Sequence, residues 1–143
     1  ATLGKVLTAF LVVVHLALTA VDFFGVYPVA DFLVRPDGSR QDPANMLPSE
    51  EIMVALVAFP FFIVVWGFTM FPQSQAALLS LAVHGVYAFH QIWKKDKWDA
   101  LVHPDSEQIT TDFFIISHIF WMVVSVIILS LSETVAFEKQ KIA

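Results

Sequence analysis

The chain has 143 residues, of which 57% are hydrophobic and only 15% charged, and its net charge is −5. Soluble domains are usually about 45–50% apolar and about 25% charged, so this 16.0 kDa chain has more apolar surface than a soluble core could bury. It has no cysteine, which excludes disulfides, thiolate metal sites and cysteine nucleophiles. It also has no basic run, so we expect no nucleic-acid partner. The composition therefore predicts an integral membrane protein.

The first apolar stretch covers residues 6–27 and is interrupted only by His15 and Asp22. A bilayer core about 30 Å thick needs roughly 20 helical residues, so this stretch is long enough to be a first span. Lys5 before an apolar run is also typical of a signal peptide, but we expect a span that is retained. The next segment, residues 28–49, is rich in proline and polar residues, which predicts an external loop.

The second and third spans follow each other closely. Residues 52–71 are apolar and uncharged, and Pro60 in their middle should kink the helix. Residues 76–93 form the third span. Only four residues, 72–75, separate the two, which predicts that they are antiparallel neighbours.

The last part of the chain predicts a polar loop and a final span. Residues 94–109 begin with three lysines and an aspartate and should form the loop, and residues 112–135 form the fourth span. A short solvated tail at 138–141 follows. The sequence thus predicts an all-α fold, a single domain over 1–143 with about four transmembrane helices and both termini on the same side of the membrane.

Charge is divided unequally between the two sides of this predicted bundle. The side with the termini carries three basic and two acidic residues, whereas the side with the two long loops carries five basic and eleven acidic ones. Lysine and arginine counts set orientation, and they favour placing the loops in the cytoplasm, matrix or stroma. The acidic loops are either a solvated face or a docking surface for a basic partner.

Ionisable residues within membrane spans are costly in lipid and usually face protein or a cavity. Placing each residue by the helical rise predicts two polar layers. His15 and His84 fall near the middle of their spans and form one layer. Asp22, His90 and His118 fall roughly 8–9 Å nearer the loops and form the second, a polar cluster within the membrane.

Imidazole suits the iron of haem and the magnesium of chlorophyll, so the candidate cofactor-binding residues are His15, His84, His118 and His90. His84 and His90 differ by six positions, about 9 Å along a helix and about 120° around it, and cannot face one bundle interior together. At most one haem is therefore expected. The Asp22 cluster could instead relay protons or hold a quinone or a divalent metal. The structural alternative is that each histidine bonds to a backbone carbonyl or hydroxyl of a neighbouring helix.

No motif in the sequence specifies a reaction, and the loops lack a glycine-rich phosphate-binding pattern. We therefore expect a non-catalytic accessory subunit of a larger energy-converting complex, respiratory or photosynthetic, whose partners are other membrane subunits and lipids. Its membrane would be the mitochondrial inner membrane, the thylakoid or a bacterial membrane. The alternative is a small four-helix enzyme or binding protein for a sterol, lipid or quinone that uses Asp22, Glu50 and His84.

Overall fold

The computed structural model describes residues 2–23, 48–99 and 110–142, and within these ranges the chain is helical and contains no strand. The helices are α1 (Thr2–Phe23), α3 (Pro48–Met70), α4 (Gln73–Trp93), α5 (Lys95–Asp99) and α6 (Thr111–Ile142). The all-α prediction is confirmed. Most of the loop predicted at 28–49 and most of the one at 94–109 lie outside the described residues, as do the side chains of Asp22 and Glu50.

The long helices begin one to four residues before the predicted spans, and helix is also present in two segments where none was predicted. The short helix α5 lies where only a loop was predicted, and Lys95 and Asp99, one turn apart, form an ion pair at 2.9 Å along it. Helix α6 continues to Ile142, so the predicted tail is helical. The tail residues 138–141 are glutamate, lysine and glutamine, which have a high intrinsic helix propensity.

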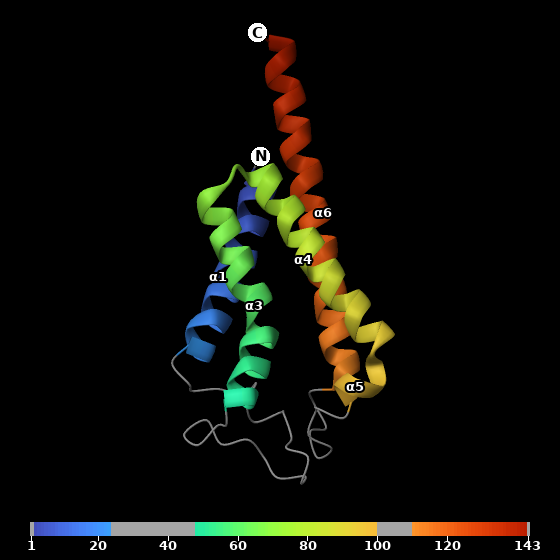
Figure 1. Ribbon diagram of the computed structural model, residues 1–143. Helices are drawn as coiled ribbons and strands as arrows, with labels where there is room; N and C mark the ends of the chain where they lie inside the picture. Colours follow the sequence, from blue (N-terminus) through green and yellow to red (C-terminus); the bar gives the residue numbers. More distant parts are fainter. Residues whose placement is uncertain (1, 24–47, 100–109, 143) are drawn as a thin grey trace.

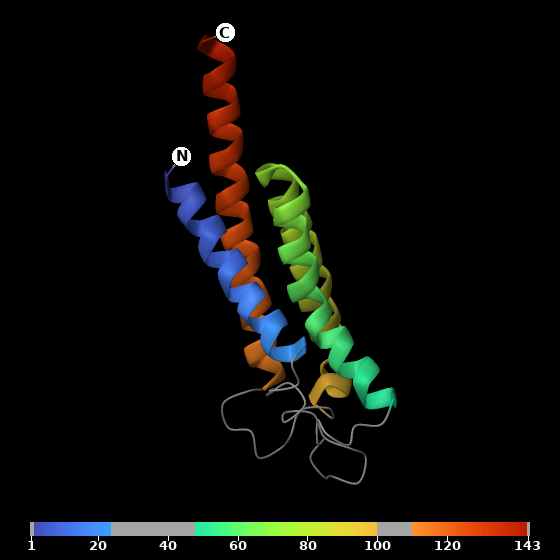
Figure 2. The same cartoon turned by 90° about the vertical axis from the view of Figure 1, so that its left-hand side faces the viewer.

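The four long helices lie roughly along a common axis (Figures 1 and 2). Helices α3 and α4 are joined through Phe71 and Pro72 and run antiparallel, as predicted, while α4 and α6 lie side by side. Helix α1 packs against both α3 and α6. The two termini lie at the same end of the bundle, where α6 projects beyond the other helices (Figure 1).

Near the α3–α4 turn, the missing side chain of Gly67 leaves room for the side chain of Leu79. A Cβ atom at Gly67 would lie 2.9 Å from Cδ2 of Leu79. Helix α1 is held at the same end by Gln73, whose Nε2 donates to Oγ1 of Thr8 at 2.6 Å and to the carbonyl of Gly4 at 3.2 Å. These polar contacts fix the N-terminal end of α1 against the start of α4.

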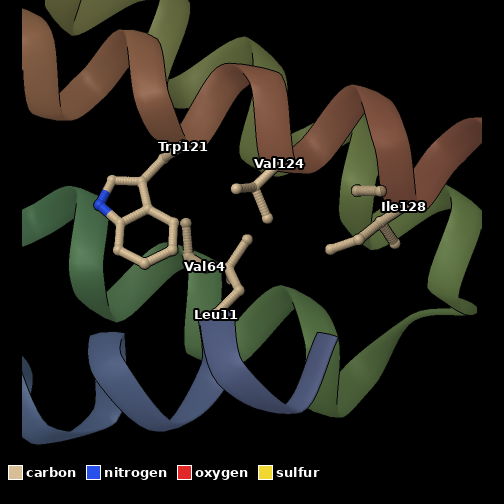
Figure 3. Packing of buried hydrophobic residues seen from close by; sticks show 6 residues of the cluster. Leu11, Val64, Trp121, Val124 and Ile128 are labelled. Atoms are coloured by element: carbon tan, nitrogen blue, oxygen red, sulfur yellow. The ribbon is translucent and has the colours of Figure 1, made fainter. Parts of the chain in front are cut away.

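An apolar layer joins all four long helices in the interior. We use this name for the buried cluster of Leu11, Val64, Ala77, Trp121, Val124 and Ile128. Figure 3 shows Leu11 of α1 and Val64 of α3 facing the three residues of α6. The layer is small for four helices, and the interior next to it is polar.

The outward faces of the long helices carry large apolar side chains. Examples from each helix are Val13, Phe62, Val86 and Ile116, which are between 54% and 65% exposed. One helical segment, Thr111–Ser132, is long and apolar enough to cross a membrane by length and composition. Leu3–Thr19 and Phe59–Met70 are apolar over shorter lengths, among the residues that the structure describes.

Candidate functional site

Two buried histidines meet between α1 and α4. The Nε2 atoms of His15 and His84 lie 3.1 Å apart, and both side chains are 0% exposed. His15 and His84, which the sequence placed at the same depth, are therefore in contact. The two residues are 69 positions apart in the chain, so their contact depends on the packing of α1 near the centre of α4.

Each of these histidines also contacts a backbone carbonyl one turn earlier in its own helix. Nδ1 of His15 lies 2.7 Å from the carbonyl oxygen of Leu11, and Nδ1 of His84 lies 2.8 Å from that of Ser80. A carbonyl oxygen can only accept a hydrogen bond, so both Nδ1 atoms carry the proton and donate. In the neutral rings the two Nε2 atoms are then both unprotonated. Two lone pairs face each other across 3.1 Å.

Two serines extend this polar layer to α6. The hydroxyl of Ser125 donates to Oγ of Ser80 at 2.9 Å and also lies 2.7 Å from the carbonyl oxygen of Trp121. Oγ of Ser80 in turn lies 3.3 Å from Nδ1 of His84. Ser80 and Ser125 are both 0% exposed. We call His15, His84, His118, Ser80 and Ser125 the histidine layer.

His118 belongs to this layer and not to a second one nearer the loops. Its ring centroid lies 5.6 Å from that of His84 and 5.7 Å from that of Tyr87. The predicted depth was wrong because it centred the fourth span on residues 112–135. The apolar part of α6 is Thr111–Ser132, so His118 lies less than four residues, or roughly 5 Å, from its middle.

The side chain of His118 is 7% exposed, and its Nδ1 atom has no hydrogen-bond partner among the described residues. A buried polar atom without a partner is costly and calls for an explanation. Two other buried oxygens share this property, Oε1 of Gln91 and Oγ1 of Thr111. His118 differs from the other two residues because its ring contacts the ring of another buried histidine, His84.

Aromatic rings enclose the histidine pair. Trp121 packs edge-on against His15 with ring centroids 4.7 Å apart, and Phe61 of α3 packs against the same ring at 5.8 Å. The structure buries Trp121, and its ring closes the histidine layer on one side.

His90 lies apart from the other histidines on the exposed side of α4, so His84 and His90 do not face one interior, as predicted. Its Nδ1 accepts a hydrogen bond from Nε1 of Trp98 at 3.1 Å. The predicted cluster of Asp22, His90 and His118 is therefore wrong for its two histidines: His90 contacts Trp98, whereas His118 contacts His84. The side chain of Asp22, its third member, lies outside the described residues.

The layer offers nitrogen ligands but no carboxylate. No three histidine, aspartate or glutamate side chains of the described residues are gathered closely enough to hold a metal ion together. His15 and His84 are also too close for a porphyrin plane between them, since axial ligands on opposite faces need roughly 4 Å between their nitrogens at about 2.0 Å per metal bond. Binding of haem or chlorophyll stays a prediction.

The sequence reasoning missed the two serines. Ser80 lies one turn before His84, and residues at this spacing share a helix face, so Ser80 could have been found from the position of the histidine. Ser125 gave no such signal because serine is common in membrane helices as a small packing residue. Its role depends on which faces of α4 and α6 are in contact, and the sequence alone does not determine that contact.

Comparisons with known proteins do not place the chain in a family. No protein-family model matches it, and no curated protein and no solved structure matches it either.

Proposed function

We propose that the chain is an integral membrane protein with four spanning helices, and that it serves as a non-catalytic accessory subunit of a larger, energy-converting membrane complex. The observation that carries the membrane part is the apolar outer surface of the bundle. Large apolar side chains cover the outside of the described helices, whereas three histidines and two serines share the interior with the apolar layer. In water this arrangement would expose apolar surface and bury polar groups, both of which are unfavourable.

The best span candidate supports the same conclusion. Only 28% of its apolar window in α6 is buried inside the structure. A helix at the core of a soluble protein is mostly buried, so this apolar surface needs another cover. Lipid or the helices of other subunits would provide it.

A non-catalytic role is supported by the surroundings of His84. The residue is fully buried, its Nδ1 is bonded to the carbonyl of Ser80, and its Nε2 faces His15. In this arrangement neither nitrogen is open to a substrate from outside the bundle. The enzyme alternative also needs Asp22 and Glu50, whose side chains lie outside the described residues.

The face of α4 that carries Val86, Phe89 and Trp93 is the best candidate for a contact with another subunit. These side chains are 65–66% exposed, and the rings of Phe89 and Trp93 lie 5.8 Å apart. Aromatic residues are enriched at the centre of protein interfaces. The alternative is that these side chains face lipid, and an experiment can distinguish the two.

The absence of cysteine makes the test direct, because single cysteines can be introduced and spin-labelled. We would label Val86→Cys on the outer face and, as a matched control, Ala88→Cys, which lies two positions away and is buried. In the isolated protein in lipid, the label at 86 should be accessible to oxygen but not to a water-soluble nickel complex. The label at 88 should be accessible to neither.

The same labels test the accessory role in the native membrane. A label at 86 that becomes immobile in the purified complex, and mobile when the chain is isolated, would support a neighbouring subunit on this face. A chain that purifies alone in mild detergent, with label 86 equally mobile in both states, would overturn the accessory role. Access of the nickel complex to label 86 would overturn the membrane assignment.

A further inference from the structure

The last turn of α4 lies at the level where a membrane-spanning helix meets the lipid headgroups. Helix α4 has 21 residues between Pro72 and Lys94, which make a rod of roughly 32 Å. A hydrocarbon core is about 30 Å thick, so when the polar start of α4 lies at one boundary, Trp93 and Lys94 lie at the other.

Lys94 carries a positive charge that the rest of this corner leaves unpaired. The lysines that follow it each have a carboxylate within ion-pair distance: Lys95 has Asp99 and Asp112, and Lys97 has Asp96. Lys94 has no such partner among the described residues. Its Nζ lies 4.8 Å from the centre of the Trp93 ring, a cation–π contact that favours one direction for the ammonium group. This charge is therefore available to an anion from outside the chain.

His90 gives the same corner a second donor. Nε1 of Trp98 donates to Nδ1 of His90 at 3.1 Å, so the proton of the neutral ring is on Nε2. His90 and Lys94 are four positions apart, and residues at this spacing share a helix face. Both residues are exposed. A phosphate oxygen between them would accept a hydrogen bond from each.

The backbone at this corner does not repel an anion. Unbonded carbonyls at the C-terminal end of a helix would do so. Here the carbonyl of His90 accepts from the amide of Lys94 at 2.8 Å, and the carbonyl of Lys94 accepts from the amides of Lys97 and Trp98 at 3.0 and 3.1 Å. The turn into α5 thus uses these carbonyls, and the exposed side-chain donors decide the local charge.

Apolar surface lies directly beside the two donors. Ile92 and Trp93 are 57% and 66% exposed. Indole rings favour the membrane interface, and lysine side chains extend along apolar surface towards the headgroups. A ligand with both a phosphate and an acyl chain matches the two surfaces together, whereas free phosphate matches only the donors. Val86 and Phe89, one to two turns nearer the membrane centre, stay available for the subunit contact.

We propose that the end of α4 binds the headgroup of an anionic phospholipid. Lys94 and the Nε2–H of His90 contact the phosphate, and Trp93 lies beside the start of an acyl chain. Lysine binds phosphate as a point charge, and because that charge is unpaired here, a lipid with a net negative charge is preferred over a zwitterionic one. The proposal rests on the membrane assignment above and adds a lipid partner to it.

The test uses the full chain in detergent, immobilised, washed free of lipid and equilibrated with radiolabelled phosphatidylglycerol or phosphatidylcholine of the same acyl chains. We expect the anionic lipid to bind about fivefold more tightly, the effect of one lysine near a headgroup. Lys94→Gln should abolish this preference, and Lys94→Arg should keep it. His90→Ala should weaken the binding of both lipids alike, because both contain a phosphate.

Lys95→Gln is the matched control. It removes the same charge one position away, and most of the preference should remain because Asp99 and Asp112 already share the charge of Lys95. The unchanged protein gives a second measurement, because raising the salt from about 0.1 M to about 1 M shortens the screening length from about 10 Å to about 3 Å. This change should remove the preference for the anionic lipid.

Three results would each overturn the proposal. They are equal binding of the two lipids by the parent chain, an equal loss of preference in Lys94→Gln and Lys95→Gln, and a preference that persists in high salt. None of them alters the accessibility of a label at position 86, which tests the membrane assignment. The lipid site and the membrane assignment can therefore fail separately.

Discussion

The apolar layer and the histidine layer lie next to each other in the bundle interior, overlap along α6, and hold helices together by different means. In α1, Leu11 belongs to the apolar layer, while His15, four positions later, belongs to the histidine layer. The first layer depends on the fit of methyl groups, and the second on directed contacts between nitrogen and oxygen atoms. In lipid, apolar burial gives helices little reason to associate, so packing and polar contacts carry the association.

The two layers also differ in which helices they specify. Every long helix contributes to the apolar layer, but the polar side chains of the histidine layer come only from α1, α4 and α6. Helix α3 contributes the ring of Phe61 there and no polar group. The polar contacts thus select the neighbours and register of three helices, and the apolar contacts fill the space around all four. Four measurements can break or sharpen this contrast.

The largest effect is expected in the apolar layer. Ile128→Ala leaves a cavity at a position that is 0% exposed, so we expect a loss of about 2–5 kcal/mol in the free energy of unfolding. Ile127→Ala is the matched control. Ile127 is 40% exposed, so its replacement should change the free energy of unfolding by no more than about 0.5 kcal/mol. Reversible unfolding in mixed micelles measures both. Equal losses at the two positions would contradict the packing of α6.

A smaller effect is expected at the polar contact that holds the start of α1. Gln73→Ala removes hydrogen bonds to Thr8 and Gly4, and we expect a loss of about 0.5–1.5 kcal/mol in the free energy of unfolding. Gln75→Ala, two positions away and exposed, serves as the control. The same unfolding assay applies. If Gln75→Ala destabilised the protein as much as Gln73→Ala, α1 would not be held by this contact.

Within the histidine layer, the two serines should be coupled only weakly. Double-mutant cycles in membrane proteins give about 0.6 kcal/mol for a hydrogen bond between helices, and we expect this value for Ser80→Ala combined with Ser125→Ala. The cycle needs the two single variants and the double variant in the unfolding assay. Strictly additive losses would mean that Ser125 stabilises α6 only through its bond to the Trp121 carbonyl.

The smallest effect is expected for polar contacts outside the bundle. Asp99 accepts a hydrogen bond from Lys95 and raises the pKa of this lysine above its ordinary value, and Asp112 lies 3.7 Å from the same Nζ. These groups are exposed and screened by salt, so Lys95→Ala should leave stability unchanged within error at physiological ionic strength. A clear loss in that assay, persisting in high salt, would show that α5 is a structural part of the bundle.

The sequence predicted the helices and the depth of the histidine pair better than it predicted which side chains are in contact. Apolar periods and polar loops predicted the long helices, and the helical rise placed His15 and His84 at one depth. Depth alone cannot say which residues face each other, because helix rotation depends on packing partners distant in the chain. This is why Ser125 was missed.

The errors have a common cause as well. His118 was placed too near the loops because the predicted fourth span was extended to residue 135, whereas the apolar part of α6 ends at Ser132. Helix α5 was missed because a segment of five residues is too short to carry a periodic signal. Local pattern predicts where a helix can exist, and tertiary contacts decide where it stops.

The length of α6 has a practical consequence for imaging. Its 32 residues make a rod of roughly 48 Å, against a hydrocarbon core of about 30 Å. The end of this rod projects past the α3–α4 turn on the side of the termini (Figures 1 and 2). In an electron microscopy map of the proposed assembly, this protruding rod would mark the position of the chain and the direction in which it points.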